Sequence, residues 1–365
     1  MAEALQSPLA GHHRAHGIAL ADYHGAAVPL RYAGHVKEHQ AVRQAAGMFD
    51  FSFRARFALT GDDRVRFLHR IVSNDIKRLV PGQGTYTTLL NAQGHILTDF
   101  RVYCATDRLL IDTDADLREK TMQSLQRYII GDRVQIVPVD CIALAIQGPK
   151  SSQFLERLFP SSSPPAGELD HVESTYSGSP VRVIRATSTG EEGFEIWAEA
   201  NTITGIWDSV CGTSSPGGPT PCGTEALESL RIEAGIPRYG ADMGEDTIPL
   251  EACLLNALSF NKGCYIGQEI VERARSRGHV NWKLTGLLVE GATPPSPGEK
   301  LISAGKEIGE VTSACISPTL GKTIAMAYLR REVSDPGAHL AFASGAAAEV
   351  TSLPFYTRSS TSPGA

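Results

Sequence analysis

The sequence predicts an α+β protein of three domains that ends in a small antiparallel β-barrel. The chain has 365 residues, which is more than one hydrophobic core usually serves. Strand-like and helix-like segments alternate along its first four-fifths. After the stretch 293–298, which is dense in Pro, Gly and Thr, only short apolar runs follow, and their spacing is typical of barrel strands.

The first α+β unit is predicted from two kinds of periodicity. Asp62 can cap a helix whose apolar side chains share one face, and period-two alternation marks two later strands. The predicted elements are a helix at 62–72, strands at 96–103 and 108–113, and a helix at 116–128.

A similar order recurs in a second unit, without a detectable sequence repeat. Its predicted elements are strands at 134–139 and 141–146, a helix at 149–159, strands at 181–186 and 194–198, and a helix at 202–210. The barrel strands are expected at 301–303, 309–314 and 323–329.

Composition excludes several functional classes. The formal net charge is −6, so no general basic surface is available for nucleic acid or anionic lipid. Seven scattered cysteines without a CxxC pair argue against a disulfide framework and favour a reducing cytosol. No apolar run reaches the roughly 20 residues that span a bilayer, and the N-terminus lacks signal-peptide order. We therefore expect a cytoplasmic protein.

The segment 262–269, Lys-Gly-Cys-Tyr-Ile-Gly-Gln-Glu, is the most informative motif. Lys262 and the arginines downstream would stabilise a thiolate at Cys264 if they fold near it, which favours a reactive cysteine. The alternative, that Cys264 is a small buried apolar residue, is equally compatible with the spacing.

Arg273, Arg275 and Arg277 fall at alternate positions, so an extended chain would present them on one face. Such a row could hold a chain of carboxylates, although charge runs often form only a solvated face. His12, His13 and His16 have a spacing compatible with metal binding, but no Cys or acid cluster lies near them. We expect exposed histidines and no metal.

Several further segments make the resemblance to a known family specific. The block 262–269 with its trailing arginines resembles the signature of YgfZ-type proteins. The segments 38–43, 47–50 and 86–91, with Gly94 and Asp99, are similar to the N-terminal half of glycine-cleavage T-proteins, and 190–195 and 230–235 continue the similarity. The chain thus resembles the T-protein superfamily, nearest to its YgfZ-type branch.

The resemblance implies a ring of three domains around a central hole that binds tetrahydrofolate. The expected limits are 1–140 and 141–282 for two α+β domains and 283–356 for the barrel, followed by a disordered tail at 357–365. Tyr86, Asp99, Glu195 and Arg231 resemble folate-contacting positions, with Glu195 suited to accept hydrogen bonds from the pterin. Asp99 resembles the carboxylate near folate N5 and N10.

Two departures from the T-protein pattern guide the functional prediction. Thr98 stands where T-proteins carry a second acid, and Ser188 replaces a tyrosine. We therefore predict a folate-binding accessory protein for iron–sulfur cluster assembly or repair, with iron–sulfur proteins as partners and Cys264 as the functional thiol. Lys262, Arg273, Arg275 and Arg277 would hold the folate, the three arginines through its polyglutamate tail. A folate-dependent aminomethyltransferase is the alternative, and a scaffold that folate only stabilises is a third possibility.

Overall fold

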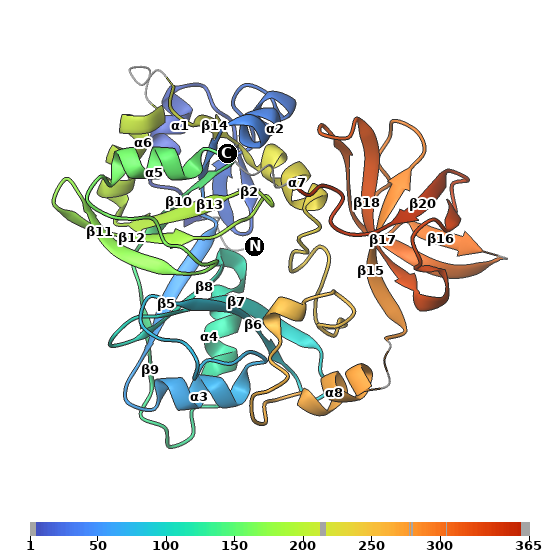
Figure 1. The fold of residues 1–365 in the computed structure, drawn as a ribbon, viewed down its shortest axis with the longest axis horizontal. Coiled ribbons are helices and arrows are strands. Elements are labelled where there is room, and N and C mark those ends of the chain that lie inside the picture. Colours follow the sequence, from blue (N-terminus) through green and yellow to red (C-terminus); the bar gives the residue numbers. More distant parts are fainter. Residues whose placement is uncertain (1–4, 212–216, 277, 279, 304, 359–365) are drawn as a thin grey trace, which may run out of the picture.

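Two α+β units and a closed barrel make up the described residues, which are 5–211, 217–276, 278, 280–303 and 305–358 of this computed structural model. Figure 1 shows the two units stacked on each other, with the barrel beside them. The predicted α+β class and the C-terminal antiparallel barrel are confirmed. Within the described residues, no helix has both the length and the apolarity that crossing a membrane requires.

The first unit contains a five-stranded antiparallel sheet, backed by helices. Phe57, Phe67, Phe100 and Leu125 are buried between the sheet and the helices and form the core of this unit. The strand order is β6 (Gly84–Leu90), β7 (Ile96–Cys104), β8 (Leu109–Asp114), β5 (Arg54–Thr60) and β9 (Gln135–Pro138). The helical elements are α3 (Arg64–Ile71), the short η1 (Ala115–Leu117) and α4 (Arg118–Gln126).

The second unit contains a six-stranded sheet. Its order is β11 (His171–Tyr176), β12 (Ser179–Arg185), β13 (Gly193–Ala198), β10 (Ile142–Gln147), β4 (Gly47–Asp50) and β14 (Thr220–Cys222). The pair β4–β14 is parallel and the other pairs are antiparallel. One apolar core of this sheet includes Leu155, Ile203 and Trp207. These come from α5 (Ser151–Leu158) and α6 (Ala200–Cys211).

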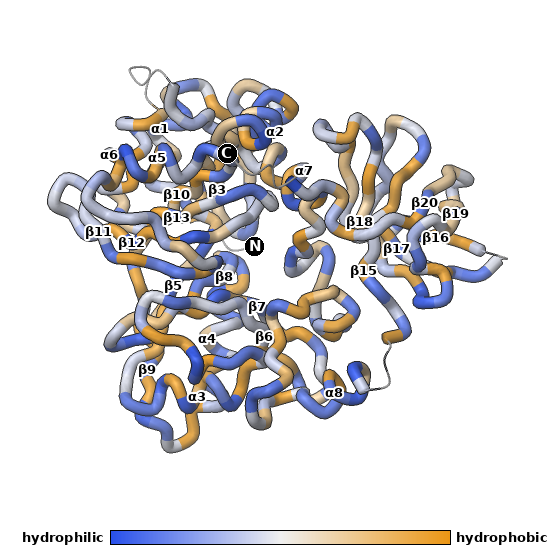
Figure 2. Tube along the Cα trace, viewed as in Figure 1, coloured by the Kyte–Doolittle hydropathy of each residue, from blue (hydrophilic) through white to orange (hydrophobic). Residues whose placement is uncertain are grey.

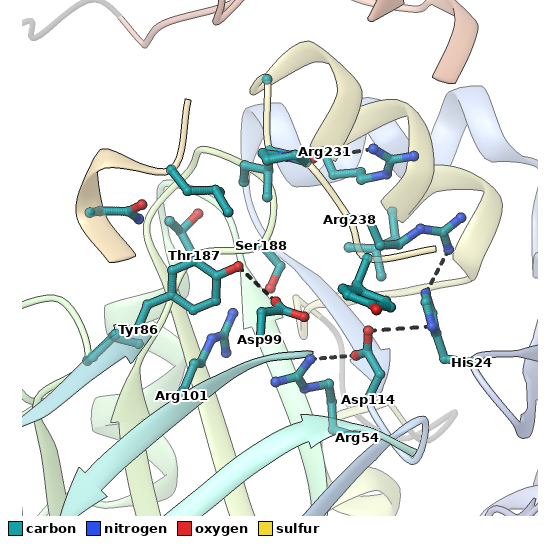
Figure 3. Close-up of a pocket in the computed structure, with 18 of the residues that line it drawn as sticks. His24, Arg54, Tyr86, Asp99, Arg101, Asp114, Thr187, Ser188, Arg231 and Arg238 are labelled. Carbon is teal, nitrogen blue, oxygen red and sulfur yellow. Dashed lines mark hydrogen bonds and ion pairs between the residues drawn. The ribbon is translucent and has the colours of Figure 1, made fainter. Parts of the chain in front are cut away.

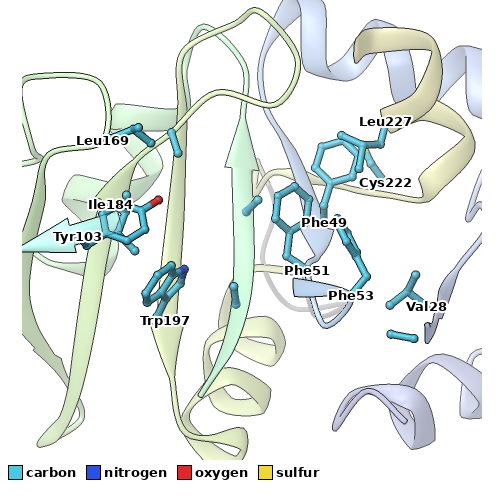
Figure 4. Packing of buried hydrophobic residues seen from close by; sticks show 14 of the residues in the cluster. Val28, Phe49, Phe51, Phe53, Tyr103, Leu169, Ile184, Trp197, Cys222 and Leu227 are labelled. Atoms are coloured by element: carbon cyan, nitrogen blue, oxygen red, sulfur yellow. The ribbon is translucent and has the colours of Figure 1, made fainter. Parts of the chain in front are cut away.

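A second apolar cluster joins the two sheets. Tyr103 of β7 meets Trp197 of β13 edge to face, with ring centroids 5.1 Å apart. Phe49 and Leu227 belong to the same buried cluster, which Figure 4 shows from close by. Figure 2 shows how hydrophobic residues gather along the strands of both units. Because burial of apolar surface is the main stabilising term, this shared core fixes one sheet against the other.

The units are not consecutive segments of the chain. Strand β4 lies between β10 and β14 in the second sheet, although β5, which follows β4 directly, belongs to the first. The limits at residues 140 and 282 therefore stay a prediction, with β4 as a segment that crosses between units. The predicted tail lies outside the described residues from 359 onward.

The remaining elements lie in the N-terminal region and in the chain between the second sheet and the barrel. They are β1 (Leu5–Gln6), α1 (Ala10–Ala15), β2 (Leu20–Tyr23), β3 (Ala26–Pro29), α2 (His35–Gln44), α7 (Thr224–Glu233), η2 (Leu255–Ala257) and α8 (Gln268–Ser276). The last two of them, η2 and α8, pack on the first unit. Strands β1, β3 and β2 form a small sheet of their own.

Six strands close the barrel. Their order is β15 (Trp282–Val289), β18 (Lys322–Arg330), β17 (Lys306–Ser317), β16 (Lys300–Ser303), β19 (His339–Phe342) and β20 (Ala347–Thr351), with the short η3 (Arg331–Val333) after β18. Buried Glu233 at the end of α7 attaches the barrel, because it accepts hydrogen bonds from Thr319 and from Ser317. Arg43 of α2 binds the same carboxylate at 2.8 Å.

Two local expectations are wrong. Helix α3 begins at Arg64, and Asp62 forms an ion pair with Arg133 (3.1 Å) instead of capping it. His13 is fully buried rather than exposed, because its Nε2 lies 3.2 Å from Asp50 and its ring packs against Trp207. A buried histidine needs such partners, since an unpaired polar ring would be costly.

Candidate functional site

A cavity of about 730 Å³ lies where both sheets meet the chain that leads to the barrel. Figure 3 shows side chains from β5, β7, β8 and the segment after α7 converging on it. Its wall is mixed in character, with several charged groups among aromatic rings. The residues used below are His24, Phe51, Phe53, Arg54, Tyr86, Asp99, Arg101, Asp114, Glu168, Ser188, Arg231, Arg238 and Tyr239.

The alternation of β7 decides which of its side chains reach the cavity. Asp99 and Arg101 line it, whereas Thr98 and Phe100 face the helices. The Oγ1 of Thr98 is 2.7 Å from the Oγ1 of Thr121 in α4. Because neighbouring residues of a strand point to opposite faces, an acid at position 98 would point toward α4. Thr98 therefore does not weaken the chemistry of this cavity.

Asp99 is the predicted site residue with the clearest chemical role. The hydroxyl of Tyr86 donates a hydrogen bond to its Oδ2 at 2.8 Å. Burial, reinforced by the negative charge of Asp114, raises the pKa of Asp99 to about 6. A carboxyl group with such a pKa can both accept and return a proton near neutral pH. Tyr86, in contrast, stays protonated, because burial raises its pKa well above 10.

Beside Asp99 runs a network of alternating charges. Arg54 donates to Asp114 at 2.5 Å, and the Nδ1 of His24 lies 3.4 Å from the other oxygen of Asp114. Arg238 lies 2.9 Å from the Nε2 of His24. Arginine can only donate, so Nε2 accepts, and the proton of a neutral His24 lies on Nδ1.

This network also contains a group with the ligand types of a metal site. The ligand atoms of His24, Asp114 and Asp116 lie within 4.8 Å of one another. Arg54 and Arg238 already bind two of these residues and compensate the negative charge. We therefore interpret the group as an ion-pair network and assign no metal to it.

Glu195, the predicted pterin acceptor, lies behind the cavity wall. Its side chain is 0 % exposed, and Arg101 donates to its Oε1 at 2.5 Å. The indole of Trp197 donates to Oε2 at 2.9 Å. Both oxygens therefore have partners within the protein, and Arg101 stands between Glu195 and the cavity.

Arg231 lines the cavity but has its donors engaged elsewhere. It binds Asp242 at 2.6 Å, Glu228 at 2.8 Å and the hydroxyl of Ser313 in the barrel at 2.7 Å. These contacts tie α7, the segment after it and the barrel together. The arrangement makes Arg231 a positioning group for the cavity wall.

The motif 262–269 lies away from this cavity and attaches its segment to the first unit. The ammonium group of Lys262 donates to the carbonyls of His69, Val72 and Asn74 at the end of α3. Burial lowers the pKa of Lys262 to about 8. Gly267 has φ +79°, and a Cβ there would lie 2.6 Å from the carbonyl of Asn91. Glycine permits this close approach.

Cys264 is exposed and is not among the residues that line the cavity. The predicted alignment of arginines on one face of an extended segment is also not observed for the two that the structure describes, Arg273 and Arg275. Arg273 and Arg275 belong to helix α8, where side chains two positions apart diverge by roughly 200°. Arg275 instead stacks on Phe260 at 4.0 Å. Arg277 lies outside the described residues, and the role of these arginines in folate binding stays a prediction.

Sequence reasoning missed six charged or ionisable residues of the cavity, namely His24, Arg54, Arg101, Asp114, Glu168 and Arg238. A signal for three of them was present. Arg54 with Arg56, Asp112 with Asp114, and Asp99 with Arg101 each occupy alternate positions of a strand. The sheet register then pairs Arg54 with Asp114 and Arg101 with Asp112. Opposite charges facing each other across strands indicate one polar face.

Comparison with known proteins finds family models that match most of this chain. Residues 9–262 match the GCVT N-terminal domain, and residues 283–357 match the glycine cleavage T-protein C-terminal barrel domain. An aminomethyltransferase from Nostoc sp. is 34% identical over 327 residues, which cover 87% of this chain and 86% of the relative. One from Desulforamulus reducens is 31% identical over 369 residues, covering 98% of this chain and 100% of the relative.

A solved structure agrees along nearly the whole length of the chain. The crystal structure of glycine cleavage system aminomethyltransferase T from Bartonella henselae superimposes with a TM-score of 0.88 at 28% identity. The match covers 96% of this chain and 98% of that structure. It therefore includes both α+β units and the barrel.

These comparisons correct the functional prediction. An accessory role in iron–sulfur assembly is wrong, because relatives that match along 86–100% of their length are named aminomethyltransferases, and nothing supports iron–sulfur proteins as partners. Assignment to the YgfZ-type branch is likewise not supported. The position of Cys264 outside the cavity and of Thr98 toward α4 removes the physical grounds for that prediction. The chain belongs to the glycine cleavage T-protein family.

Proposed function

We propose that this protein is an aminomethyltransferase of the glycine cleavage T-protein type, with tetrahydrofolate as acceptor. The observation that carries the proposal is the similarity to proteins of that name across both α+β units and the barrel. The donor would be an aminomethyl group bound to a thiol of a carrier protein.

The reaction balances without an oxidant. The carbon of R–S–CH2–NH2 leaves both sulfur and nitrogen and forms bonds to N5 and N10 of tetrahydrofolate, each of which gives up one proton. The products are methylene-tetrahydrofolate, the free thiol R–SH and ammonia. The step therefore needs a group that accepts a proton from a folate nitrogen and returns it to the leaving amine.

Asp99 has the properties that this proton transfer requires. It lines the cavity, and its pKa of about 6 makes both protonation states available near neutral pH. Its negative charge also favours the positive charge that develops on the aminomethyl carbon. Tyr86 holds the carboxyl group by its hydrogen bond.

The rest of the cavity suits a flat heterocycle with polar edges. Phe51, Phe53 and Tyr239 supply aromatic wall, and a cavity of about 730 Å³ lies within the usual range for ligands of this size. Ser188 also lines it. Its small side chain leaves room for a ligand at that wall.

The test is ammonia release from a lipoyl carrier protein loaded with an aminomethyl group. We expect release that depends on tetrahydrofolate and is matched, mole for mole, by methylene-tetrahydrofolate. Mixtures without folate and mixtures with unloaded carrier serve as controls. Ammonia release at the same rate with and without tetrahydrofolate would contradict the proposal.

A further inference from the structure

The pair formed by Arg101 and Glu195 decides which side chain meets a ligand at this wall. Glu195 is 0 % exposed, and each of its oxygens is bound within the protein, to Arg101 at 2.5 Å and to Trp197 at 2.9 Å. A second cation, Arg56, has its Nη2 4.0 Å from Oε2. The carboxylate is thus enclosed by donors of the chain itself.

Arg101 has the opposite exposure. Its side chain is 18 % exposed and lines the cavity, and Figure 3 shows it rising from β7 beside Tyr86 and Asp99. Among the described residues, Nη1 is its one nitrogen with a hydrogen-bonded partner, which is Glu195. The guanidinium carries five N–H donors and no acceptor. Its remaining donors have no hydrogen-bonded partner among the described residues, and the side chain lines the cavity, so they are available to a ligand there.

From this geometry we propose that Arg101, and not Glu195, forms the hydrogen bond that recognises the ring of the ligand. Because Arg101 is a donor, it selects a ring edge that carries a hydrogen-bond acceptor. The inference rests on the proposed function, which supplies a reduced pterin as the ligand. Glu195 acts through Arg101 as a positioning residue. The acceptor on a pterin that suits a guanidinium is the carbonyl oxygen at carbon 4.

Glu168 adds a carboxyl group to the lining of the same cavity, where it accepts a hydrogen bond from the backbone N–H of Thr187 at 3.1 Å. It lines the cavity, burial raises its pKa, and the charge of Arg101 acts on it in the opposite sense. An ionised carboxylate can only accept hydrogen bonds. A donor and an acceptor that both line the cavity suit the carbonyl and the N–H of a 4-oxo ring, whereas a 4-amino ring would place a donor against Arg101.

The discrimination should be measurable because hydrogen bonds to charged groups are among the stronger ones. Replacing the acceptor by a donor removes one such bond and leaves two donors facing each other. Sites of this kind discriminate by roughly tenfold or more. The two probes are tetrahydrofolate and its 4-amino counterpart, in which an amino group replaces the carbonyl and N3 carries no hydrogen, so both changes disfavour the 4-amino ring at this site.

The experiment is calorimetric titration of both probes into the wild-type chain and three variants. Wild type should bind tetrahydrofolate at least roughly tenfold more tightly than the 4-amino ring. Arg101→Leu should lose this preference or reverse it, because Glu195 is then free to accept a hydrogen bond. Arg101→Lys keeps a cationic donor and should keep the order. Glu195→Gln should also keep it, because its amide oxygen can still hold Arg101.

The outcomes separate this inference from the proposed function. If wild type binds neither probe, the proposed function loses its acceptor and the inference falls with it. Binding of tetrahydrofolate without discrimination overturns the inference alone. Loss of the preference in Glu195→Gln but not in Arg101→Lys would show that Glu195 reads the ring itself. These two variants also decide the question if Arg101→Leu does not fold.

Discussion

Strand β7 and helix α8 both carry charged residues two positions apart, but only the strand places them side by side. Asp99 and Arg101 line the same wall of the cavity, whereas Arg273 and Arg275 lie on a helix and point in different directions. The same spacing thus has opposite consequences, because a strand repeats every two residues and a helix every 3.6. Charge spacing identifies a binding face only after the local backbone is known.

The comparison predicts its largest effect at Asp99. Replacing it by Asn removes the group that exchanges the proton, so aminomethyl transfer should slow by about 10² to 10⁴-fold. Thr98→Ser is the matched control. Residue 98 is the neighbour of Asp99 on the opposite face of β7, and a serine hydroxyl there can keep the hydrogen bond to Thr121. Rates of ammonia release measure both. Equal rates for wild type and Asp99→Asn would break the distinction between the two faces.

The pH dependence of the rate should follow the same carboxyl group. Burial raises the pKa of Asp99 to about 6, so the rate should rise tenfold per unit below that pH and level off above it. The hydrogen bond from Tyr86 favours the charged form and lowers this pKa. Tyr86→Phe should therefore move the midpoint to higher pH. An unchanged midpoint in this variant would show that Tyr86 does not influence the pKa of Asp99.

A smaller effect, on stability rather than on chemistry, is expected at Lys262. Its ammonium group satisfies three carbonyls at the end of α3, and Lys262→Met would leave them without that donor. We expect a loss of about 2 to 3 kcal/mol in the free energy of unfolding. Lys77→Met, at an exposed neighbouring lysine, should cost less than about 0.5 kcal/mol. Urea unfolding of the three proteins checks the difference.

The smallest effect is expected at Cys264. Because the exposed thiol lies outside the cavity, Cys264→Ala should leave the rate of aminomethyl transfer within about twofold of wild type and the stability within about 0.5 kcal/mol. Alkylation of the wild-type thiol provides an independent check. A rate reduced by more than tenfold in both cases would place Cys264 in the catalytic machinery and reverse the comparison.

Sequence periodicity was sufficient to predict the elements whose pattern lies within one segment of the chain. The strand that carries Asp99 and the barrel strands after residue 293 follow from alternation and turn residues. The engagement of Glu195 could not be predicted in this way, because it depends on Arg101 from the other sheet. Contacts between segments far apart in the chain carry no local signal.

The motif 262–269 illustrates the other limit. Its residue types fit a reactive thiol, but its lysine and second glycine are required by packing against α3 and the turn before β7. Glycine and lysine serve equally well in a ligand site and in a tight contact between segments. The two uses can be distinguished only when the contacts of this motif with the first unit are known, and those contacts join segments far apart in the chain.

The place of β4 in the second sheet bears on how the chain folds during synthesis. This strand is translated early, whereas its neighbours β10 and β14 follow later. At ribosomal rates of about 5 to 20 residues per second, β4 emerges roughly 5 to 20 seconds before β10 is complete. During that interval its apolar residues have no sheet to join. A nascent chain halted between β9 and β10 would therefore expose Met48 and Phe49, which are buried in the folded protein, and would offer them to a chaperone.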